Sequence, residues 1–244
     1  MWPFSKKRYS LIDSGLLQGM TDCHSHILPG VDDGVQTLED SLRTLQILGD
    51  LGVSKLWLTP HIMEDIPNTT ADLKKHFVEL THKLPSPKIE LHLAAEHMLD
   101  GLFARRFAEK DVLPLGALSS APAHPLLLVE TSYFNPPLHF WDMLEDIRRQ
   151  GYTPVLAHPE RYVYMHGSDY QRLTDMGVIL QLNLLSLTGA YGEGARHKAL
   201  RLLYSGFYTL MGTDLHNVDD FVEYASEKCL TKKDIDTLAG INTL

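Results

Sequence analysis

The stretch "GMTDCHSHILPGVDDGVQTLEDSLRTLQILGDLGVSKLWLTPH", residues 19–61, places an amphipathic segment between two short apolar runs. The runs at 19–24 and 54–61 have the length of buried strands. Residues 37–52 repeat apolar side chains at helical spacing and end in a glycine, which is typical of a helix C-terminus. Two strands joined by a helix at this distance predict a βαβ unit with parallel strands.

The same alternation continues along the rest of the chain. Further strands are predicted at 89–96, 125–130, 153–158, 178–184 and 208–214, and further helices at 69–84, 137–151, 169–177 and 194–206. Seven such units without a domain-sized interruption predict an α/β fold that closes into a TIM-like barrel. The 244 residues are enough for one barrel-sized domain. Residues 1–17 are expected to form an N-terminal extension and residues 18–244 the barrel domain.

Composition argues against several classes of partner. The formal charge of −9 and the absence of clustered Lys and Arg argue against nucleic-acid binding. The two cysteines form no disulfide framework, and no stretch approaches the ~20 apolar residues of a membrane span. We therefore expect a cytoplasmic protein without an integral membrane segment, with Lys6, Lys7 and Arg8 in a solvated tail. The sequence carries no signal for an oligomeric state.

Side chains that can bind metal ions stand at the ends of six predicted strands. His24 and His26 are two residues apart, so on an extended chain they face the same side. The other candidates are His61, Glu96, Glu130, His158, Asp214 and His216, with Asp33 in the loop after the first strand. In a parallel barrel all strand C-termini lie at one rim, so these nine residues are expected to converge.

The expected cluster favours metal ions over a purely structural role. A single His or carboxylate of this kind is often a hydrogen-bonded core group or part of an ion pair. Several buried carboxylates together cost several kcal/mol per ion unless cations neutralise them. Imidazole and carboxylate ligands without thiolate suit Mn, Fe or Zn. Because one catalytic zinc takes about three protein ligands, two or three divalent ions are predicted, with Glu130 as a candidate bridge. Such centres commonly hydrolyse phosphate esters.

The motifs "HSHILPGVDDG", "TPH", "AAE", "LLLVE", "AHPERY" and "GTDLHN" together resemble the polymerase and histidinol phosphatase (PHP) superfamily, and within it the bacterial tyrosine-protein phosphatases of the CpsB/YwqE type. The resemblance runs from about residue 22 to residue 216. It implies a distorted (β/α)7 barrel, a two- or three-metal centre, often manganese or iron, and the nine residues above as its ligands. It also implies dephosphorylation of phosphotyrosine on a tyrosine kinase that regulates capsular or exopolysaccharide synthesis and export.

The resemblance also assigns catalytic and substrate-binding residues. Arg161 in "HPERY" matches an arginine that contacts the substrate phosphate, and its planar fork suits two phosphate oxygens. Its alternative role is a surface ion pair. Asp214 or a histidine, with His216 as the candidate, is expected to protonate the leaving phenolate. Relatives tend to carry a second arginine after their D-x-H-N motif, whereas this chain has Asp219 and Asp220 there.

Other readings remain open from the sequence. A cysteine nucleophile needs an arginine six residues later, but Pro29 follows Cys23 and Ile235 follows Cys229 at that distance. The same barrel can serve a small-molecule phosphoesterase acting on histidinol phosphate or a nucleotide, or a non-catalytic metal-binding regulator that docks to an export kinase. The aromatics near the predicted site are candidates for a slot that holds a phenyl ring, or for closing the barrel top: Tyr133, Phe134, Tyr162 and Tyr164.

Overall fold

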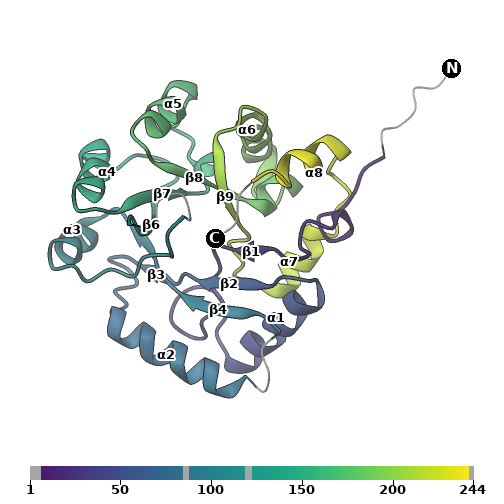
Figure 1. Cartoon of the computed structure of the whole chain (residues 1–244), viewed down its shortest axis with the longest axis horizontal. Helices are drawn as coiled ribbons and strands as arrows, with labels where there is room; N and C mark the ends of the chain where they lie inside the picture. Colours follow the sequence, from purple (N-terminus) through teal and green to yellow (C-terminus); the bar gives the residue numbers. More distant parts are fainter. Residues whose placement is uncertain (1–6, 85–87, 119–122, 242–244) are drawn as a thin grey trace.

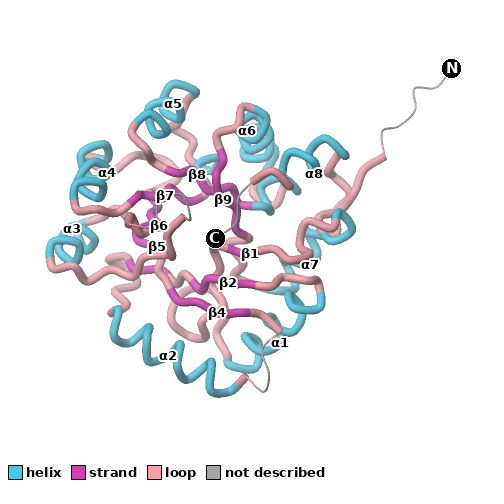
Figure 2. The backbone as a smooth tube through the Cα atoms, viewed as in Figure 1, coloured by secondary structure: helices cyan, strands magenta, loops and turns pink. Residues whose placement is uncertain are grey.

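The computed structural model describes residues 7–84, 88–118 and 123–241. The strands lie around the centre of the molecule and the helices lie outside them (Figures 1 and 2). The strands are β1 (Thr21–Asp22), β2 (Lys55–Leu58), β3 (His61–Ile62), β4 (Glu90–Leu93), β5 (Glu96–Met98), β6 (Leu126–Glu130), β7 (Thr153–Ala157), β8 (Ile179–Asn183) and β9 (Tyr208–Gly212). The predicted α/β class is confirmed.

The strands form two parallel sheets. One has the order β1-β2-β4 and the other the order β3-β5-β6-β7-β8-β9. The segments 54–61 and 89–96, each predicted as one strand, divide between the two sheets, so the prediction of continuous strands there is wrong. In the first segment the break falls at Pro60, which has no N–H to donate to a ladder.

The chain that follows β1 is joined to the chain that follows β9. Asp214 N donates to His24 O at 2.8 Å. The buried carboxylate of Asp22 accepts hydrogen bonds from Thr213 N at 2.9 Å and from Thr213 Oγ1 at 2.6 Å. These bonds connect residues that are about 190 positions apart in sequence, and they bring the two ends of the strand series together.

The helices are α1 (Leu38–Asp50), α2 (Thr70–Lys83), α3 (Gly101–Ala108), α4 (Phe140–Arg149), α5 (Gly167–Asp175), α6 (Gly192–Tyr204), α7 (Val218–Ala225) and α8 (Lys232–Leu238), with 3-10 segments η1 (Ile12–Ser14), η2 (Pro159–Arg161) and η3 (Leu184–Thr188). The five helices expected from periodicity are present. Thr37 and Thr69 cap α1 and α2 by accepting from backbone N–H groups of the first turn. The helices α3, α7 and α8 were not predicted, because at seven or eight residues they span too few turns for a clear period. Within the described ranges, no helix combines the length and apolarity needed to cross a bilayer.

The buried apolar side chains of the strands belong to two clusters. The larger one includes Leu127 and Val129 of β6, together with the inward sides of the helices. The smaller one, here called the inner cluster, consists of Cys23, Ala94, Leu115, Leu126, Leu128, Val155, Ala157 and Leu210. Because side chains alternate along a strand, Glu130 continues the row of Leu126 and Leu128. The inner cluster therefore lies below the carboxylate that ends β6.

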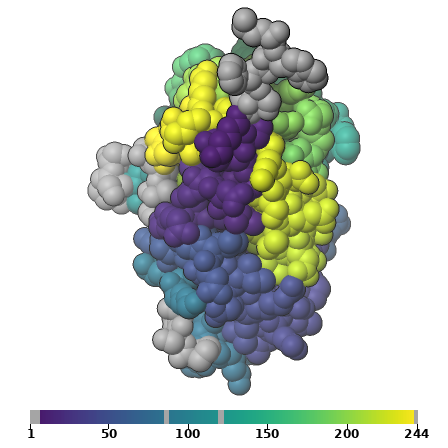
Figure 3. Space-filling model, turned by 90° about the vertical axis from the view of Figure 1, so that its right-hand side faces the viewer, coloured from purple at the N-terminus to yellow at the C-terminus, as the bar shows by residue number. Residues whose placement is uncertain are grey.

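The N-terminal residues pack against the C-terminal part of the chain. Tyr9 pairs with Leu230 through two backbone hydrogen bonds of 2.8 and 2.9 Å. Figure 3 shows the N-terminal segment, in purple, beside the C-terminal segment, in yellow. Leu11 and Leu17 are buried in the larger core cluster. Of the expected basic tail, Lys6 lies outside the described residues, and Lys7 and Arg8 are exposed.

This packing predicts that residues 7–17 contribute to stability. Leu11→Ala is expected to lower the free energy of unfolding by about 2–5 kcal/mol, because it leaves a cavity in the core. Urea denaturation followed by circular dichroism measures the change. The control is Leu138→Ala, which makes the same substitution at a side chain that is 87% exposed and is expected to change the value by less than about 0.5 kcal/mol. Equal midpoints for the two variants would contradict the burial of Leu11.

Candidate metal centre

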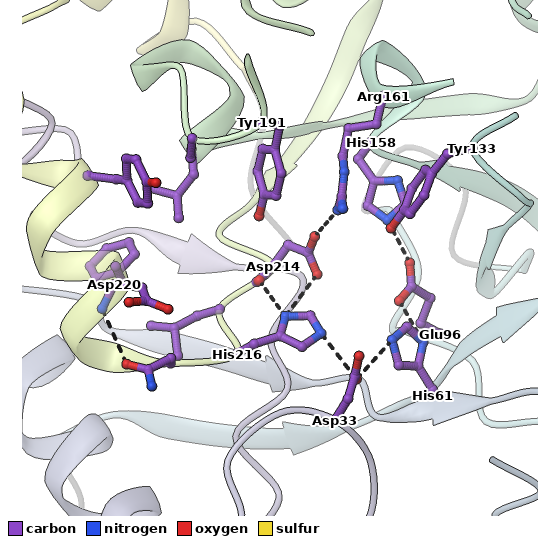
Figure 4. A pocket seen from close by; sticks show the side chains of 16 residues that line it. Asp33, His61, Glu96, Tyr133, His158, Arg161, Tyr191, Asp214, His216 and Asp220 are labelled. Atoms are coloured by element: carbon purple, nitrogen blue, oxygen red, sulfur yellow. Dashed lines mark hydrogen bonds and ion pairs between the residues drawn. The ribbon is translucent and has the colours of Figure 1, made fainter. Parts of the chain in front are cut away.

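The expected cluster is present where the strands end. His24 and His26 follow β1, Glu130 ends β6, His158 follows β7, and Asp214 and His216 follow β9. His61 and Glu96 begin β3 and β5, rather than ending their strands as predicted, because both segments are divided. Of the nine expected ligands, Asp33 is exposed, His216 is partly buried, and the other seven are buried. Figure 4 shows Asp33 between His61 and His216.

Eight of the nine expected ligands form three overlapping groups whose donor atoms lie within 4.8 Å of one another. The groups are His26, Asp33, His61 and His216; His24, His26, Glu96 and Asp214; and His61, Glu96 and Glu130. In the described part of the chain His158 belongs to none of these groups. Its Nε2 lies 3.1 Å from Glu96 Oε1 and 3.9 Å from Glu130 Oε2, so it borders two of them.

Atoms at the centre of the cluster are buried without hydrogen bonds. His61 Nδ1, Glu96 Oε2 and Glu130 Oε1 find no hydrogen-bond partner among the described residues. The nitrogen nevertheless lies 3.1 Å from the Glu96 oxygen and 3.0 Å from the Glu130 oxygen. A buried polar atom without a partner costs about 1–3 kcal/mol. Convergent nitrogen and carboxylate oxygen atoms that lack partners fit a site for divalent cations of the Mn, Fe or Zn type.

The charges of the cluster act strongly on one another. Burial alone would lower the pKa of His24, but the negative charges of Glu96 and Asp214 outweigh it and raise that pKa to about 9. Burial alone would raise the pKa of Glu96, but the charge of His24 and the contact of Glu96 Oε1 with His158 Nε2 at 3.1 Å hold that pKa well below its usual range. Glu96 is therefore ionised at neutral pH. Metal ions and protons compete for the same imidazole nitrogens here.

Two polar side chains orient the first histidine pair. Asp32 Oδ2 accepts from His26 Nδ1 at 2.8 Å and from the backbone N of His61 at 3.0 Å. Gln181 Oε1 accepts from His24 Nδ1 at 2.8 Å. Both contacts leave the Nε2 atom of the histidine directed toward the cluster. Partners of this kind fix the tautomer and the ring orientation of metal-binding histidines.

Sequence reasoning missed both orienting residues. Asp32 stands beside the expected ligand Asp33, and the sequence alone does not tell which of the two carboxylates faces His26. Gln181 had a weak signal, since it is a polar residue in the middle of the apolar strand β8. It shares one face of that strand with Asn183.

Two glycines allow the backbone to approach the histidines closely. A Cβ atom on Gly212 would lie 2.5 Å from His24 Cβ. A Cβ atom on Gly34 would lie 2.1 Å from His26 O. Contacts below 3.0 Å force a shift of the neighbouring atoms. Any larger residue at either position would therefore displace a histidine of the cluster.

Arg161 points into the same cavity from η2. Its Nη1 donates to Asp214 Oδ2 at 2.7 Å, and Asn183 Nδ2 donates to the same oxygen at 2.9 Å. The guanidinium lies between two aromatic rings, 4.4 Å from the centroid of Tyr133 and 4.1 Å from that of Tyr191, as Figure 4 shows. The ion pair is therefore part of the site rather than of the outer surface. Tyr191 was not anticipated, because no motif marks its loop.

The cavity above the cluster has a volume of about 390 Å³. Tyr133 lines it, whereas Tyr162 is fully buried and the hydroxyl of Tyr164 is hydrogen-bonded to Thr131. Neither Tyr162 nor Tyr164 is among the residues that line this cavity. Asp220, one of the two aspartates that follow the motif "GTDLHN" closely, also lines the cavity.

Known proteins match most of this chain. A family model described as "Capsular polysaccharide synthesis, CpsB/CapC" matches residues 20–232. The tyrosine-protein phosphatase YwqE of Bacillus subtilis is 28% identical over 204 residues, which cover 82% of this chain and 78% of that protein. The tyrosine-protein phosphatase CpsB of Streptococcus pneumoniae is 26% identical over 220 residues, which cover 85% and 87%.

A solved structure shares the fold. It comes from work on YwqE from Bacillus subtilis and CpsB from Streptococcus pneumoniae, which it describes as metal-dependent tyrosine phosphatases. It superposes with a TM-score of 0.73 at 22% identity and covers 92% of this chain and 96% of its own. Because the family model spans most of the chain, this protein belongs to the CpsB/CapC family of capsular polysaccharide synthesis.

Proposed function

We propose that this protein is a metal-dependent protein-tyrosine phosphatase. The observation that carries the proposal is one cavity that is lined both by Arg161 and by members of all three overlapping groups of metal-competent donors. Relatives named as tyrosine-protein phosphatases support it. The proposed substrate is phosphotyrosine on a bacterial tyrosine kinase that regulates capsular or exopolysaccharide synthesis and export, in the cytoplasm.

The proposal extends to the architecture of the domain. Residues 18–244 act as one PHP-type phosphatase domain in which the two sheets together form a distorted (β/α)7 barrel. The hydrogen bonds between the chain after β1 and the chain after β9 support this closure. Residues 1–17 are an extension that packs on the domain through Leu11 and Leu17.

The proposed ligands are the nine residues expected from the strand ends: His24, His26, Asp33, His61, Glu96, Glu130, His158, Asp214 and His216. Two or three divalent ions suit this number of donors, with manganese or iron favoured. Glu96 belongs to two of the three groups and Glu130 to one, so Glu96 is the stronger candidate for a ligand that two ions would share. When bound, such ions lower the pKa of an attacking water and neutralise charge on the phosphate oxygens.

The protein's own side chains then hold the substrate. Arg161 uses one nitrogen on Asp214, so its remaining donors are available to phosphate oxygens. Burial would raise the pKa of Asp214, but the charges and hydrogen bonds of His24 and His26 hold it below its ordinary value. Asp214 therefore serves as a ligand better than as an acid. Of the two proton donors expected from the sequence, His216 remains for the leaving phenolate, and in that role it would not also bind an ion.

Metal removal and a substrate panel test the proposal. Purified protein with Mn²⁺ is assayed on a phosphotyrosine peptide, histidinol phosphate and a nucleotide, with and without EDTA. We expect turnover of the peptide above the other two, loss of turnover in EDTA, and recovery when Mn²⁺ is added back. Preference for histidinol phosphate or the nucleotide would favour the small-molecule phosphoesterase. No turnover of any substrate would favour the metal-binding regulator.

The orienting role of Asp32 predicts an effect on metal affinity. Asp32→Asn keeps the shape of the side chain but removes the charge that faces His26, so metal affinity should fall about tenfold or more. Equilibrium dialysis with elemental analysis measures the affinity and the number of ions bound. The control is Asp65→Asn at an exposed position, for which no change is expected. Unchanged metal affinity in Asp32→Asn would show that Asp32 does not orient His26 for metal binding.

The phosphate-binding role of Arg161 predicts a split between kinetic constants. Arg161→Ala should raise KM for a phosphotyrosine peptide by about tenfold or more, with a smaller effect on kcat, because it removes a charge-assisted contact to the substrate. Steady-state kinetics measure both. Arg172→Ala is the matched control, since Arg172 also stacks on an aromatic ring, that of Trp141. A wild-type KM in Arg161→Ala contradicts the assignment.

A further inference from the structure

A second cavity of about 530 Å³ adjoins the metal cavity. The two share Tyr133, Arg161 and Tyr191, so Arg161 and its two rings form the wall between them. We call this second cavity the rim groove and define it by Tyr133, Phe134, Arg161, Val163, Tyr191 and Lys198. Nothing in the reaction proposed above uses its outer residues.

The rim groove is bordered by apolar side chains that face solvent. Phe134 is 69% exposed and Val163 is 60% exposed. Seven large hydrophobic residues are exposed in the described part of the chain, and three of them, Phe134, Leu138 and Val163, come from the two loops that follow β6 and β7. Exposed apolar residues that gather at one place mark binding surfaces, whereas scattered ones need no explanation.

The walls of the groove are held in place by hydrogen bonds. Val163 N donates to Tyr133 O at 2.9 Å, which joins the two loops. Lys198 on α6 donates through Nζ to the backbone oxygen of Tyr162. The groove is therefore formed before any ligand arrives, so binding carries little ordering cost.

The charge of the groove is opposite to that of the whole chain. Arg161 and Lys198 are its cationic residues. The one carboxylate among its lining residues, Glu160, is buried and accepts from Ser186 Oγ at 2.7 Å and Tyr208 Oη at 2.9 Å. In a chain with a formal charge of −9, this surface combines apolar rings with positive charge.

We infer that the rim groove binds the part of a substrate polypeptide that flanks the phosphotyrosine, with a preference for a large apolar side chain next to it. This inference rests on the proposed function. With the phosphate beside Arg161 in the metal cavity, the main chain of the substrate leaves across Tyr133 and Tyr191. Consecutive residues are about 3.8 Å apart, so we place a residue adjacent to the phosphotyrosine in the rim groove, which Phe134 and Val163 border. Phe134 and Val163 are thus specificity-determining residues.

Synthetic peptides with one phosphotyrosine test this inference. The residue before it, and in a second series the residue after it, is Leu, Ala or Lys in an otherwise constant peptide. In the wild type, Leu in one of the two series should raise kcat/KM about three- to tenfold over Ala, because part of its side chain is buried. Lys should lower kcat/KM, because Arg161 and Lys198 repel it.

The variants locate the preference on the protein. Phe134→Ala combined with Val163→Ala should reduce the ratio of kcat/KM for the Leu and Ala peptides to about one, while the matched control Val78→Ala, at an exposed site on α2, keeps the wild-type ratio. Thermal melting verifies that each variant is folded. Two outcomes would overturn the assignment of the rim groove to the flanking residue. One is a ratio that stays at the wild-type value in the double variant. The other is a wild type that hydrolyses phenyl phosphate but shows no preference among the flanking residues. Failure to hydrolyse phenyl phosphate and every peptide overturns the proposed function itself.

Discussion

Three carboxylates, those of Glu96, Glu130 and Asp214, are at most 4% exposed at the centre of the candidate site. Anions removed from water in this way cost several kcal/mol each unless positive charge lies next to them. The Arg161 guanidinium and protonated imidazoles supply part of that positive charge. The raised pKa of His24 shows that the neighbouring carboxylates favour its protonated form. The donor atoms without partners at His61, Glu96 and Glu130 indicate where the remaining charge belongs.

The backbone at the site is held in an unfavourable conformation. Four residues other than glycine have positive φ among the described residues, and two of them, His158 at 34° and Asp214 at 52°, are proposed ligands. Left-handed backbone at such residues costs about 1–3 kcal/mol and persists only where the surroundings impose it. At His158 this turn starts η2 and carries Arg161 back over the cluster. At Asp214 it lets one carboxylate oxygen face His24 while the other meets Arg161.

Arg161 connects the chemistry of the site to its surroundings. Its charge is paired with a proposed ligand on one side and its faces are covered by Tyr133 and Tyr191. A guanidinium packed in this way keeps its direction without binding a substrate, so less freedom is lost when phosphate arrives. Tyr133, Arg161 and Tyr191 line both cavities. Phosphate binding and recognition of a flanking segment therefore depend on the same three side chains.

The α/β class, five of the helices and eight residues of the donor cluster could be predicted without a structure. The sequence suffices for these because periodicity is local, and because parallel strands bring their C-terminal ends to one edge whatever their exact register. The folded chain was needed to show that Asp32 rather than Asp33 holds His26, that Gln181 holds His24, and that Tyr191 covers Arg161. The His24–Gln181 contact joins residues 157 positions apart. Contacts of that kind depend on strand register and on the loops above the sheet, which no local pattern encodes.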